Sequence, residues 1–320
     1  MKRYFSKFFS ILCFFIISLV SFSSSLKEGE YYTLTILHTN DIHGNVEELP
    51  KYSTLIKQVR NSVKNLLVLE GGDIFARGEF KIFNGIPEMK MINEMGYDAW
   101  VIGNNDFRIP INEAIPKNDQ TINNLIKLSK QPTLCANVIY KDNGKLLEGV
   151  KPYIIKKING VKIGIIGLTS LKPQDRGYEP DKIFLDAVEV LKKQLKELEG
   201  KTDINIVLSH CGLAVDTKLG NVPGVAAIIG ADDHYHMTNP IYWVWNNEKG
   251  TPIVQHGGEE DHVLGNLELI FQETDDKLKL IDFRGSEYDT QFTPEDKKIR
   301  KIIDEYRDKL KNIPVIRIPA

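Results

Sequence analysis

Cysteine is scarce in this sequence. Only three of the 320 residues are cysteine, and Cys13 lies in an apolar N-terminal run, which leaves Cys135 and Cys211 in the rest of the chain. Two cysteines are too few for a disulfide framework, and their positions lack the spacing of a zinc–thiolate site. We expect two buried thiols, with a single disulfide bond as the alternative.

An excess of charge of one sign is also absent. The chain has 41 basic and 43 acidic residues, which gives a formal net charge of −2. Lys2, Arg3 and Lys7 lie in a segment without acids, so the remainder of the chain is more acidic than the total indicates. An acidic surface does not attract the phosphate backbone of DNA or RNA. We therefore exclude nucleic acid polymers as partners.

Long apolar runs are limited to one, at residues 8–20. A short basic stretch precedes this run and small residues follow it at 21–25, which is the pattern of a secretory signal peptide. The run is shorter than the ~20 residues that span a bilayer. We predict a signal peptide over residues 1–25, cleaved near Ser25, and an exported protein, periplasmic or extracellular, without a membrane span. An uncleaved anchor is the alternative.

The first half of the chain alternates between short apolar strands and amphipathic helices. This alternation is typical of a mixed α/β sheet covered by helices. Gly96 follows the second helix at a position where glycine commonly ends helices. We predict strands over residues 32–38, 66–69, 99–102 and 133–138, and helices over residues 47–62, 79–95 and 112–130.

The second half is richer in strands. Asn159-Gly160 predicts a tight hairpin between strands 153–158 and 161–168. We further predict strands over 204–208, 225–229, 242–245, 253–255, 263–271 and 278–283, a helix over 181–199, and a final helix from Thr293 to about Leu310. Two β-rich halves with outer helices predict an α/β fold, a four-layer α/β/β/α sandwich. Because no linker, repeat or low-complexity tract interrupts it, we expect one domain over residues 26–320.

Polar clusters follow five of the predicted strands directly. Loops at the carboxyl ends of strands converge on the ligand crevice of an open α/β sheet. Each cluster alone is typical of a turn, but together they hold five of the seven histidines, four of them beyond the predicted strand that ends at His38. Their Asp, His and Asn side chains offer only nitrogen and oxygen ligands, which suit one or two divalent ions such as Mn, Fe, Co or Zn. The clusters are His38–Gly44, Gly71–Asp73, Gly103–Asp106, Ser209–Gly212 and Asp233–His236.

These motifs, LTILHTNDIHGN, GGD, GN, SH-x-G and His-x-His, resemble the calcineurin-like metallophosphoesterases. Within them, the sequence is most similar to the N-terminal catalytic domain of the secreted 5′-nucleotidases and 2′,3′-cyclic phosphodiesterases, over roughly residues 32–270. The resemblance implies a two-metal centre that hydrolyses small phosphate esters with a metal-activated hydroxide, and nucleotides are among the candidate substrates. In those nucleotidases a separate C-terminal domain binds the base, and we expect none within residues 26–320.

Carried over by motif, the resemblance assigns seven metal ligands. Asp41, His43 and His236 would hold one ion, Asn104, His210 and His234 would hold the other, and Asp73 would bridge the two. The same seven residues stand at the predicted strand ends. Neither the identity of the metals nor the substrate-binding residues follow from the sequence.

The third motif departs from the family pattern. The family has Gly-Asn-His-Glu-Phe-Asp, where the histidine assists catalysis and the last aspartate steadies it. This chain has Asn105 and Arg108 at those two positions. An amide cannot transfer a proton at neutral pH, and general acid catalysis is typically worth ~10²–10⁴-fold in rate. Arg108 or Arg77 could act as a charge clamp on the phosphate, and His256 or His262 could replace the imidazole.

A second departure concerns residues 230–234, where the family commonly has Gly-Gly-His and this chain has an extra acidic pair, Asp232 and Asp233. They would adjust the surroundings of the ligands or lengthen an exposed loop.

Three functions remain open at this point. The first is an exported metallophosphoesterase with reduced activity, and the second is a metal-bound pseudoenzyme that binds phosphate or nucleotide with little or no turnover. The third is an interaction partner whose missing domain another chain supplies.

Overall fold

The structure is a computed structural model. It describes residues 26–75, 77–108, 120–170, 181–245, 248–258 and 262–313. The predicted signal peptide and the first part of the helix expected over 112–130 lie outside these ranges. Within the described part of the chain, no helix combines the length and the apolar character needed to cross a membrane.

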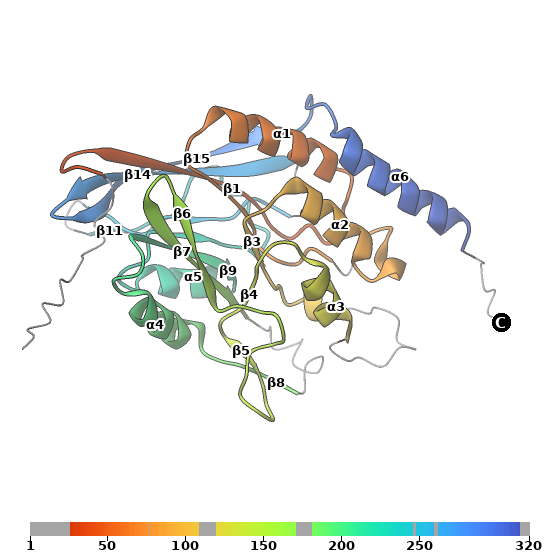
Figure 1. Ribbon diagram of the computed structural model, residues 1–320, viewed down its shortest axis with the longest axis horizontal. Coiled ribbons are helices and arrows are strands. Elements are labelled where there is room, and N and C mark those ends of the chain that lie inside the picture. The colour runs from red at the N-terminus through yellow and green to blue at the C-terminus, as the bar shows by residue number, and fades with distance from the viewer. Residues whose placement is uncertain are drawn as a thin grey trace, which may run out of the picture.

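A six-stranded sheet is built mainly from the first half of the chain (Figure 1). Its inner strands run parallel from β1 to β4, and β14 and β15 add antiparallel partners at the β1 edge. The spatial order is β15 (Lys277–Asp289), β14 (Val263–Thr274), β1 (Tyr31–Thr39), β2 (Leu66–Glu70), β3 (Ala99–Val101) and β4 (Thr133–Leu134).

A five-stranded sheet comes from the second half of the chain. Its order is β13 (Ile253–Val254), β10 (Ala227–Ile229), β9 (Ile204–His210), β7 (Val161–Thr169) and β6 (Tyr153–Ile158). Two small two-stranded sheets pair β5 (Val138–Tyr140) with β8 (Lys182–Phe184) and β11 (Val244–Trp245) with β12 (Glu248–Lys249).

The two sheets pack face to face, and each carries helices on its outer face. Side chains of β1 point alternately to the two faces of the larger sheet, so both faces are apolar. Leu34 and Ile36 lie in the core between the sheets, whereas Leu37 lies in the core under the helices. Helices α1 (Leu49–Ser62), α2 (Ile86–Met95), α3 (Gln120–Leu128) and α6 (Lys297–Lys311) cover the larger sheet, and α4 (Ala187–Leu198) and α5 (Leu213–Gly220) cover the smaller one (Figure 1). The predicted α/β/β/α sandwich is confirmed.

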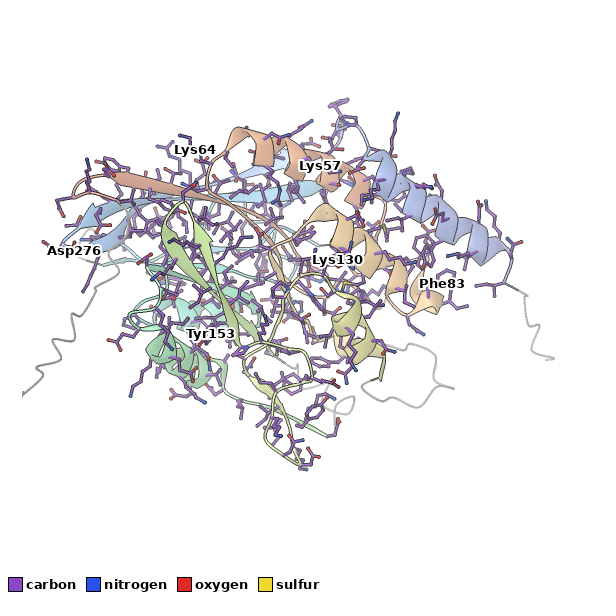
Figure 2. The ribbon with its side chains drawn as sticks, viewed as in Figure 1. Lys57, Lys64, Phe83, Lys130, Tyr153 and Asp276 are labelled. Atoms are coloured by element: carbon purple, nitrogen blue, oxygen red, sulfur yellow. The ribbon has the colours of Figure 1, made fainter. Side chains whose placement is uncertain are left out.

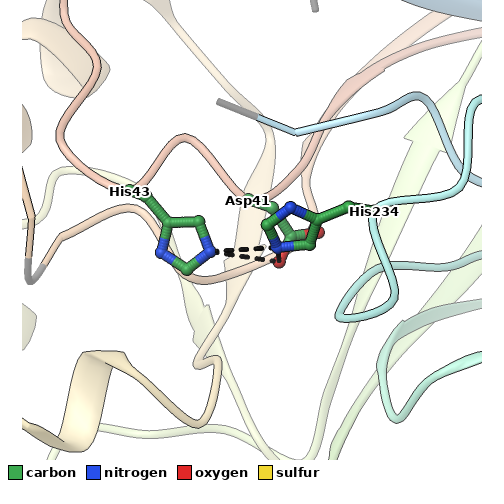
Figure 3. A group of neighbouring side chains, drawn as sticks. All are labelled: Asp41, His43 and His234. Carbon is green, nitrogen blue, oxygen red and sulfur yellow. Dashed lines mark hydrogen bonds and ion pairs between the residues drawn. The ribbon is translucent and has the colours of Figure 1, made fainter. Parts of the chain in front are cut away.

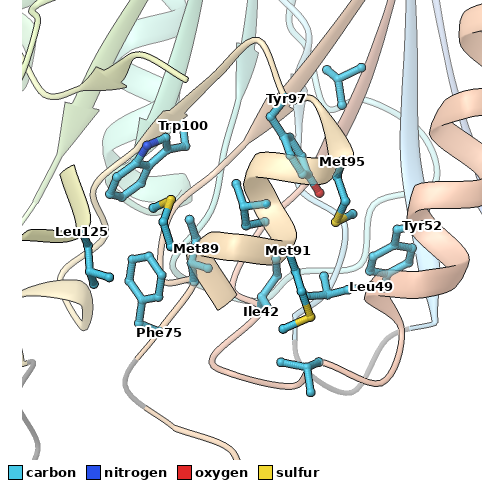
Figure 4. Close-up of a cluster of buried hydrophobic side chains, with 14 of the residues drawn as sticks. Ile42, Leu49, Tyr52, Phe75, Met89, Met91, Met95, Tyr97, Trp100 and Leu125 are labelled. Carbon is cyan, nitrogen blue, oxygen red and sulfur yellow. The ribbon is translucent and has the colours of Figure 1, made fainter. Parts of the chain in front are cut away.

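The helix layer over the larger sheet is packed with methionine and aromatic side chains (Figure 4). Trp100 of β3 meets Phe75 edge to face at 5.9 Å between ring centroids. Met89, Met91 and Met95 of α2 fill the space between these rings and α1. Exposed lysines such as Lys57 and Lys130 lie on the outer surface (Figure 2).

The hairpin signal is confirmed, and several element boundaries differ from expectation. Asn159 and Gly160 both have positive φ, as the expected tight turn requires. α2 begins only at Ile86, because Asn84 and Gly85 adopt left-handed conformations just before it. α4 begins at Ala187, where Asp186 caps it, and residues 182–184 form β8 instead of helix.

Two further elements differ from expectation. The strand expected over residues 133–138 is divided into β4 and β5. The N-terminus of α6 is capped by the Asp296 side chain, which accepts a hydrogen bond from the Lys298 backbone, so the predicted start at Thr293 is wrong.

Cys135 and Cys211 are buried free thiols, as expected.

Candidate metal centre

The loops after β1 and β2 are joined directly to each other. Because these strands are parallel neighbours, the polar residues that follow them leave the sheet side by side. The Asp41 backbone N–H donates to the Gly72 carbonyl at 3.0 Å, and the His43 N–H donates to the Asp73 carbonyl at 2.8 Å. These bonds fix three buried side chains, those of Asp41, His43 and Asp73, in one region.

The loop after β3 and the end of β9 join the same region. Asp106 accepts hydrogen bonds from the backbone N–H groups of Asp73, at 2.9 Å, and Gly103, at 2.8 Å. His210, at the end of β9, donates from Nδ1 to the Gly71 carbonyl at 2.7 Å, since a carbonyl can only accept. This bond connects the two sheets and leaves His210 Nε2 facing the carboxylates.

The backbone is strained where these side chains are presented. Asp41, His43, Asp73 and His234 have φ between 50° and 58°, and Asp232 has φ 85°. Such left-handed conformations are uncommon for residues other than glycine and cluster at functional sites. Five of them in one small region indicate that the fold is organised around these side chains.

One group of ligand atoms consists of Asp41 Oδ1, His43 Nε2 and His234 Nε2 (Figure 3). The carboxylate oxygen lies 3.8 Å from His43 Nε2 and 3.4 Å from His234 Nε2, and the two imidazole nitrogens lie 3.1 Å apart. His234 is the most exposed of the three, so this group opens to solvent on its side.

A second group surrounds His210 Nε2. Asn104 Oδ1 lies 3.2 Å from it, Asp73 Oδ2 lies 3.3 Å from it, and Asp232 Oδ1 lies 3.7 Å from it. Asp73 Oδ2 is also 3.7 Å from His43 Nε2, so this carboxylate lies between the two groups. This geometry is compatible with the bridging role that the family resemblance implies for Asp73, which stays a prediction.

These atoms are suited to cations. Asp41 Oδ2 accepts bonds from the Asn40 side chain and the Asp232 backbone, whereas the buried Oδ1 has no hydrogen-bond partner. Burial alone would lower the pKa of His210, yet Asp73, Asp41 and Asp232 raise it above its usual range. The same negative potential that favours an imidazolium ion favours a divalent cation.

Of the seven expected ligands, six converge and His236 lies apart. His236 Nε2 is 2.7 Å from Glu287 Oε2 of β15, and its backbone pairs with His256. The expected assignment of His236 to the first ion and His234 to the second therefore differs from this arrangement. The local backbone explains this difference, because the side chains that point toward the ligand cluster after β10 are those of Asp232 and His234.

Asp232 is the residue of this centre that sequence reasoning missed. Its carboxylate is buried and faces His210. Matching Gly230-Ala231-Asp232 to the family's Gly-Gly-His without an insertion would have put an aspartate where the family has its first histidine. Asp233, by contrast, points away and accepts a hydrogen bond from the Leu213 backbone at 2.6 Å.

Asn105 is held against the central carboxylate. Its backbone N–H donates to Asp73 Oδ1 at 2.7 Å, and its side-chain amide donates to Asp73 Oδ2 at 2.5 Å. Arg108 ends the next short turn, η2 (Asp106–Arg108), and its N–H closes that turn onto the Asn105 carbonyl at 2.9 Å. Burial is the main cause that lowers the pKa of His43, and the contact with Asp41 is the main cause that raises the pKa of His234, while the positive charge of the exposed Arg77 acts to lower both.

The remaining histidines have other surroundings. His38 is buried with its Nε2 3.1 Å from His256 Nδ1, and burial followed by the neighbouring His256 lowers the pKa of His38. His262 is largely exposed and lies 3.1 Å from Glu48. A cleft of about 330 Å³ lies beside His43, and its described lining holds no Phe, Tyr or Trp side chain. The lining residues are His43, Gly44, Asn45, Val46, Glu47, Gly78 and Glu79.

Residues 34–236 match the calcineurin-like phosphoesterases. The chain belongs to this family. The match covers the strands and loops that supply all of the converging ligand atoms. The resemblance and the fold class inferred from the motifs are thereby confirmed.

Several known proteins are similar over most of the chain. The trifunctional nucleotide phosphoesterase YfkN of Bacillus subtilis is 28% identical over 321 aligned residues, covering 90% of this chain and 21% of YfkN. UshA of Escherichia coli is 30% identical, covering 71% of this chain and 44% of UshA. The 5′-nucleotidase of Vibrio cholerae is 34% identical, covering 62% of this chain and 37% of that protein. The chain thus spans between about a fifth and a half of these relatives.

Solved structures agree with the fold. A 5′-nucleotidase precursor from Thermus thermophilus superposes with a TM-score of 0.75 at 25% sequence identity, covering 88% of this chain and 59% of that chain. YfkN from Bacillus subtilis superposes with a TM-score of 0.73 at 21% identity, covering 88% of this chain and 98% of the other. At that identity the second likeness shows the fold alone.

Proposed function

We propose that this protein is an exported phosphoesterase with a two-metal centre that hydrolyses small phosphate esters, nucleotides among them. The observation that carries the proposal is the position of Asp73, whose Oδ2 lies within 3.7 Å of ligand nitrogens in both groups. A carboxylate between two sets of ligands is the arrangement that holds two ions close together. Membership in the calcineurin-like phosphoesterases supports the same reaction class.

The proposed ligand sets follow the distances. Asp41, His43 and His234 would hold the first ion together with Asp73, and Asp73 would bridge to a second ion held by Asn104 and His210. His236 is left out of this proposal because Glu287 engages its ring. When bound, such ions supply Lewis-acid charge to a phosphate and lower the pKa of water.

The chain's own residues would bind and orient the ester. The strained loops hold the ligand side chains in place before substrate arrives, so little reorganisation accompanies the reaction. Arg77, whose charge already acts on His43 and His234, is the basic residue that we propose to bind the phosphate. Asn105 keeps Asp73 oriented through two hydrogen bonds but cannot donate a proton to the leaving oxygen.

A second function, phosphate or nucleotide binding with little turnover, is favoured by Asn105 alone. The metal ligands are separate from the residue that would protonate a leaving group, so the centre can bind ions and phosphate without efficient catalysis. Nucleotides are included as substrates or ligands because the names of several relatives specify nucleotide substrates. The apolar segment at 8–20 supports export with cleavage near Ser25, and N-terminal sequencing of the recovered protein would refute the cleavage if residues 1–25 were retained.

The test is a hydrolysis assay on the protein expressed from residue 26, loaded with Mn²⁺. Aryl phosphate monoesters and diesters are the first substrates, followed by nucleoside monophosphates and cyclic phosphates. The matched control is Asp73→Ala, which removes the carboxylate between the two ligand groups. We expect a rate that exceeds the control on at least one ester class. Equal rates for both proteins would overturn the enzyme and favour the binding function.

A further inference from the structure

Asp232 brings a third oxygen ligand to the second group. Its Oδ1 lies 3.7 Å from His210 Nε2, beside the oxygens of Asp73 and Asn104 that lie 3.3 Å and 3.2 Å from the same nitrogen. The Asp232 side chain is only 4% exposed. Its carboxylate is therefore held in the protein against the His210 imidazole.

The backbone fixes this orientation. Asp232 has a left-handed φ of 85°, and its N–H donates to Asp41 Oδ2 at 3.0 Å. This bond ties Asp232 to a ligand of the first group, while the preceding strand β10 ties it to β9 and His210. A left-handed backbone conformation is uncommon for aspartate and costs free energy, so contacts with the surrounding structure must hold Asp232 in it. Such conformations cluster at functional sites.

The two groups consequently differ in chemistry. The first offers two imidazole nitrogens, from His43 and His234, with carboxylate oxygens from Asp41 and Asp73. The second offers one imidazole nitrogen, from His210, with four side-chain oxygens within 4 Å of it, from Asn104, Asp73, Asp232 and Asp41. Carboxylate and carbonyl oxygens suit hard ions such as Mn²⁺ and Mg²⁺, whereas imidazole suits Zn²⁺ and Fe²⁺.

We propose that Asp232 is a metal ligand and that it makes the second position an oxygen-rich site selective for hard divalent ions, Mn²⁺ or Mg²⁺ over Zn²⁺. This inference rests on the proposed two-metal function and adds to it the class of ion at one position. An aspartate in place of an imidazole also adds a negative charge, which strengthens the attraction for a divalent ion in a buried site.

Three variants test the proposal. Asp232→Asn keeps the size of the side chain but removes its charge, and Asp232→His restores an imidazole. Asp233→Asn is the matched control, because Asp233 is the adjacent aspartate and its carboxylate binds the Leu213 backbone instead of the ligand cluster. Each folded protein, verified by circular dichroism, is titrated with Mn²⁺ and with Zn²⁺ by equilibrium dialysis with elemental analysis. The electron paramagnetic resonance signal of a coupled Mn²⁺ pair is recorded in parallel.

We expect two Mn²⁺ per chain and a coupled signal in the parent protein and in Asp233→Asn. In Asp232→Asn the second Mn²⁺ should bind about tenfold or more weakly, and the coupled signal should be lost at matched metal concentration. Asp232→His should bind two ions again, with the ratio of Zn²⁺ to Mn²⁺ affinity at the second position raised about tenfold.

Two results would overturn the proposal, and they are distinguishable from failure of the function. If Asp232→Asn binds two Mn²⁺ as tightly as the parent protein, the charged carboxylate of Asp232 does not hold the second ion and the proposal fails, although the two-metal centre stands. If Asp232→His leaves the Zn²⁺ to Mn²⁺ ratio unchanged, Asp232 does not set the selectivity. If the parent protein itself fails to bind two ions, the proposed function falls with the inference.

Discussion

At the residue scale, the difference between a phosphoesterase and a binding protein depends on Asn105. The amide donates to Asp73 and so supports the proposed ligands, but it has no proton to give to a departing alkoxide. Esters with good leaving groups, such as aryl phosphates, do not need that proton. The expected activity is therefore strongly dependent on the leaving group.

Asn105→His should raise turnover. We expect a gain of about 10²-fold for alkyl phosphates and a smaller gain for aryl phosphates, because only the poor leaving group depends on general acid catalysis. The measurement is kcat for both ester classes with Mn²⁺ present. Asn105→Gln serves as the control, since it keeps an amide and adds no acid. No gain in a folded variant with a normal Mn²⁺ content would contradict the role given to this position.

Individual ligands are the part of the candidate site that the sequence predicts least completely. The strand-end motifs identified Asp41, His43, Asp73, Asn104 and His210 because each of them follows an apolar run in a recognisable cluster. Position after a strand alone did not separate Asp232 from His236, because which side chain of Asp232–His236 turns inward depends on the backbone conformation after β10. That conformation is set by contacts with Asp41, which lies far away in the sequence.

At the scale of elements, the loops between strands are positioned by close backbone contacts. A Cβ added to Gly103 would overlap Asp73 Oδ1 and the Asp73 backbone nitrogen. The loop after β3 therefore approaches the loop after β2 only because residue 103 lacks a side chain.

Gly103→Ala should displace Asp73 and weaken metal binding. We expect a loss of stability of about 1–3 kcal/mol, typical of overpacking, and a lower Mn²⁺ affinity in the same variant. Thermal unfolding and Mn²⁺ dialysis measure the two effects. Gly220→Ala is the control, because a Cβ there would meet its nearest neighbour, Ile253, at an ordinary 3.5 Å. Equal Mn²⁺ affinity in Gly103→Ala and the parent protein would contradict this account of the loop.

Element boundaries show why local patterns predict only part of the fold. The Asn159-Gly160 hairpin was predictable since its conformation is encoded in two adjacent residues. The separation of β8 from α4 was not, because residues 182–184 pair with β5 across a distance of more than 40 positions. The start of α6 at Lys297 is set by Asp296, whose carboxylate also accepts bonds from Ser53 and Lys57 of α1.

At the scale of the whole molecule, the layers bury several acids away from the candidate centre. Glu88 in α2 is 1% exposed, and burial raises the pKa of this side chain to about 7 from an ordinary 4.5. Between pH 4.5 and about 7, Glu88 is therefore protonated in the folded protein and ionised in the unfolded chain. Stability from this group is complete below pH 4.5 and is lost as the pH rises through about 7.

Glu88→Gln should remove that part of the pH dependence. Relative to the parent protein, we expect the variant to gain up to about 3 kcal/mol in free energy of unfolding between pH 5 and pH 8. Denaturant titrations at pH 5, 6, 7 and 8 give the difference at each pH, which isolates Glu88 from other buried acids. A constant difference across this range would show that Glu88 titrates normally in the folded protein.

The arrangement of layers could be predicted because it follows from alternating apolar residues and from helices between strands. The meeting of both sheets at one centre follows from the parallel strands, whose carboxyl ends carry the motifs. The division of the chain into a signal segment and one domain stays a prediction, and so does the assignment of individual ligands. The first depends on residues 1–25, which lie outside the described part of the chain, and the second depends on where metal ions bind.

The central claim is that two ions at this centre support phosphate ester hydrolysis. The most direct measurement is the rate of 4-nitrophenyl phosphate hydrolysis by the metal-free protein as Mn²⁺ is added in known equivalents. The account predicts a rate that rises with added metal and levels off at two Mn²⁺ per chain. A rate that levels off at one equivalent, or a folded protein that gains no activity with any amount of Mn²⁺, would contradict it.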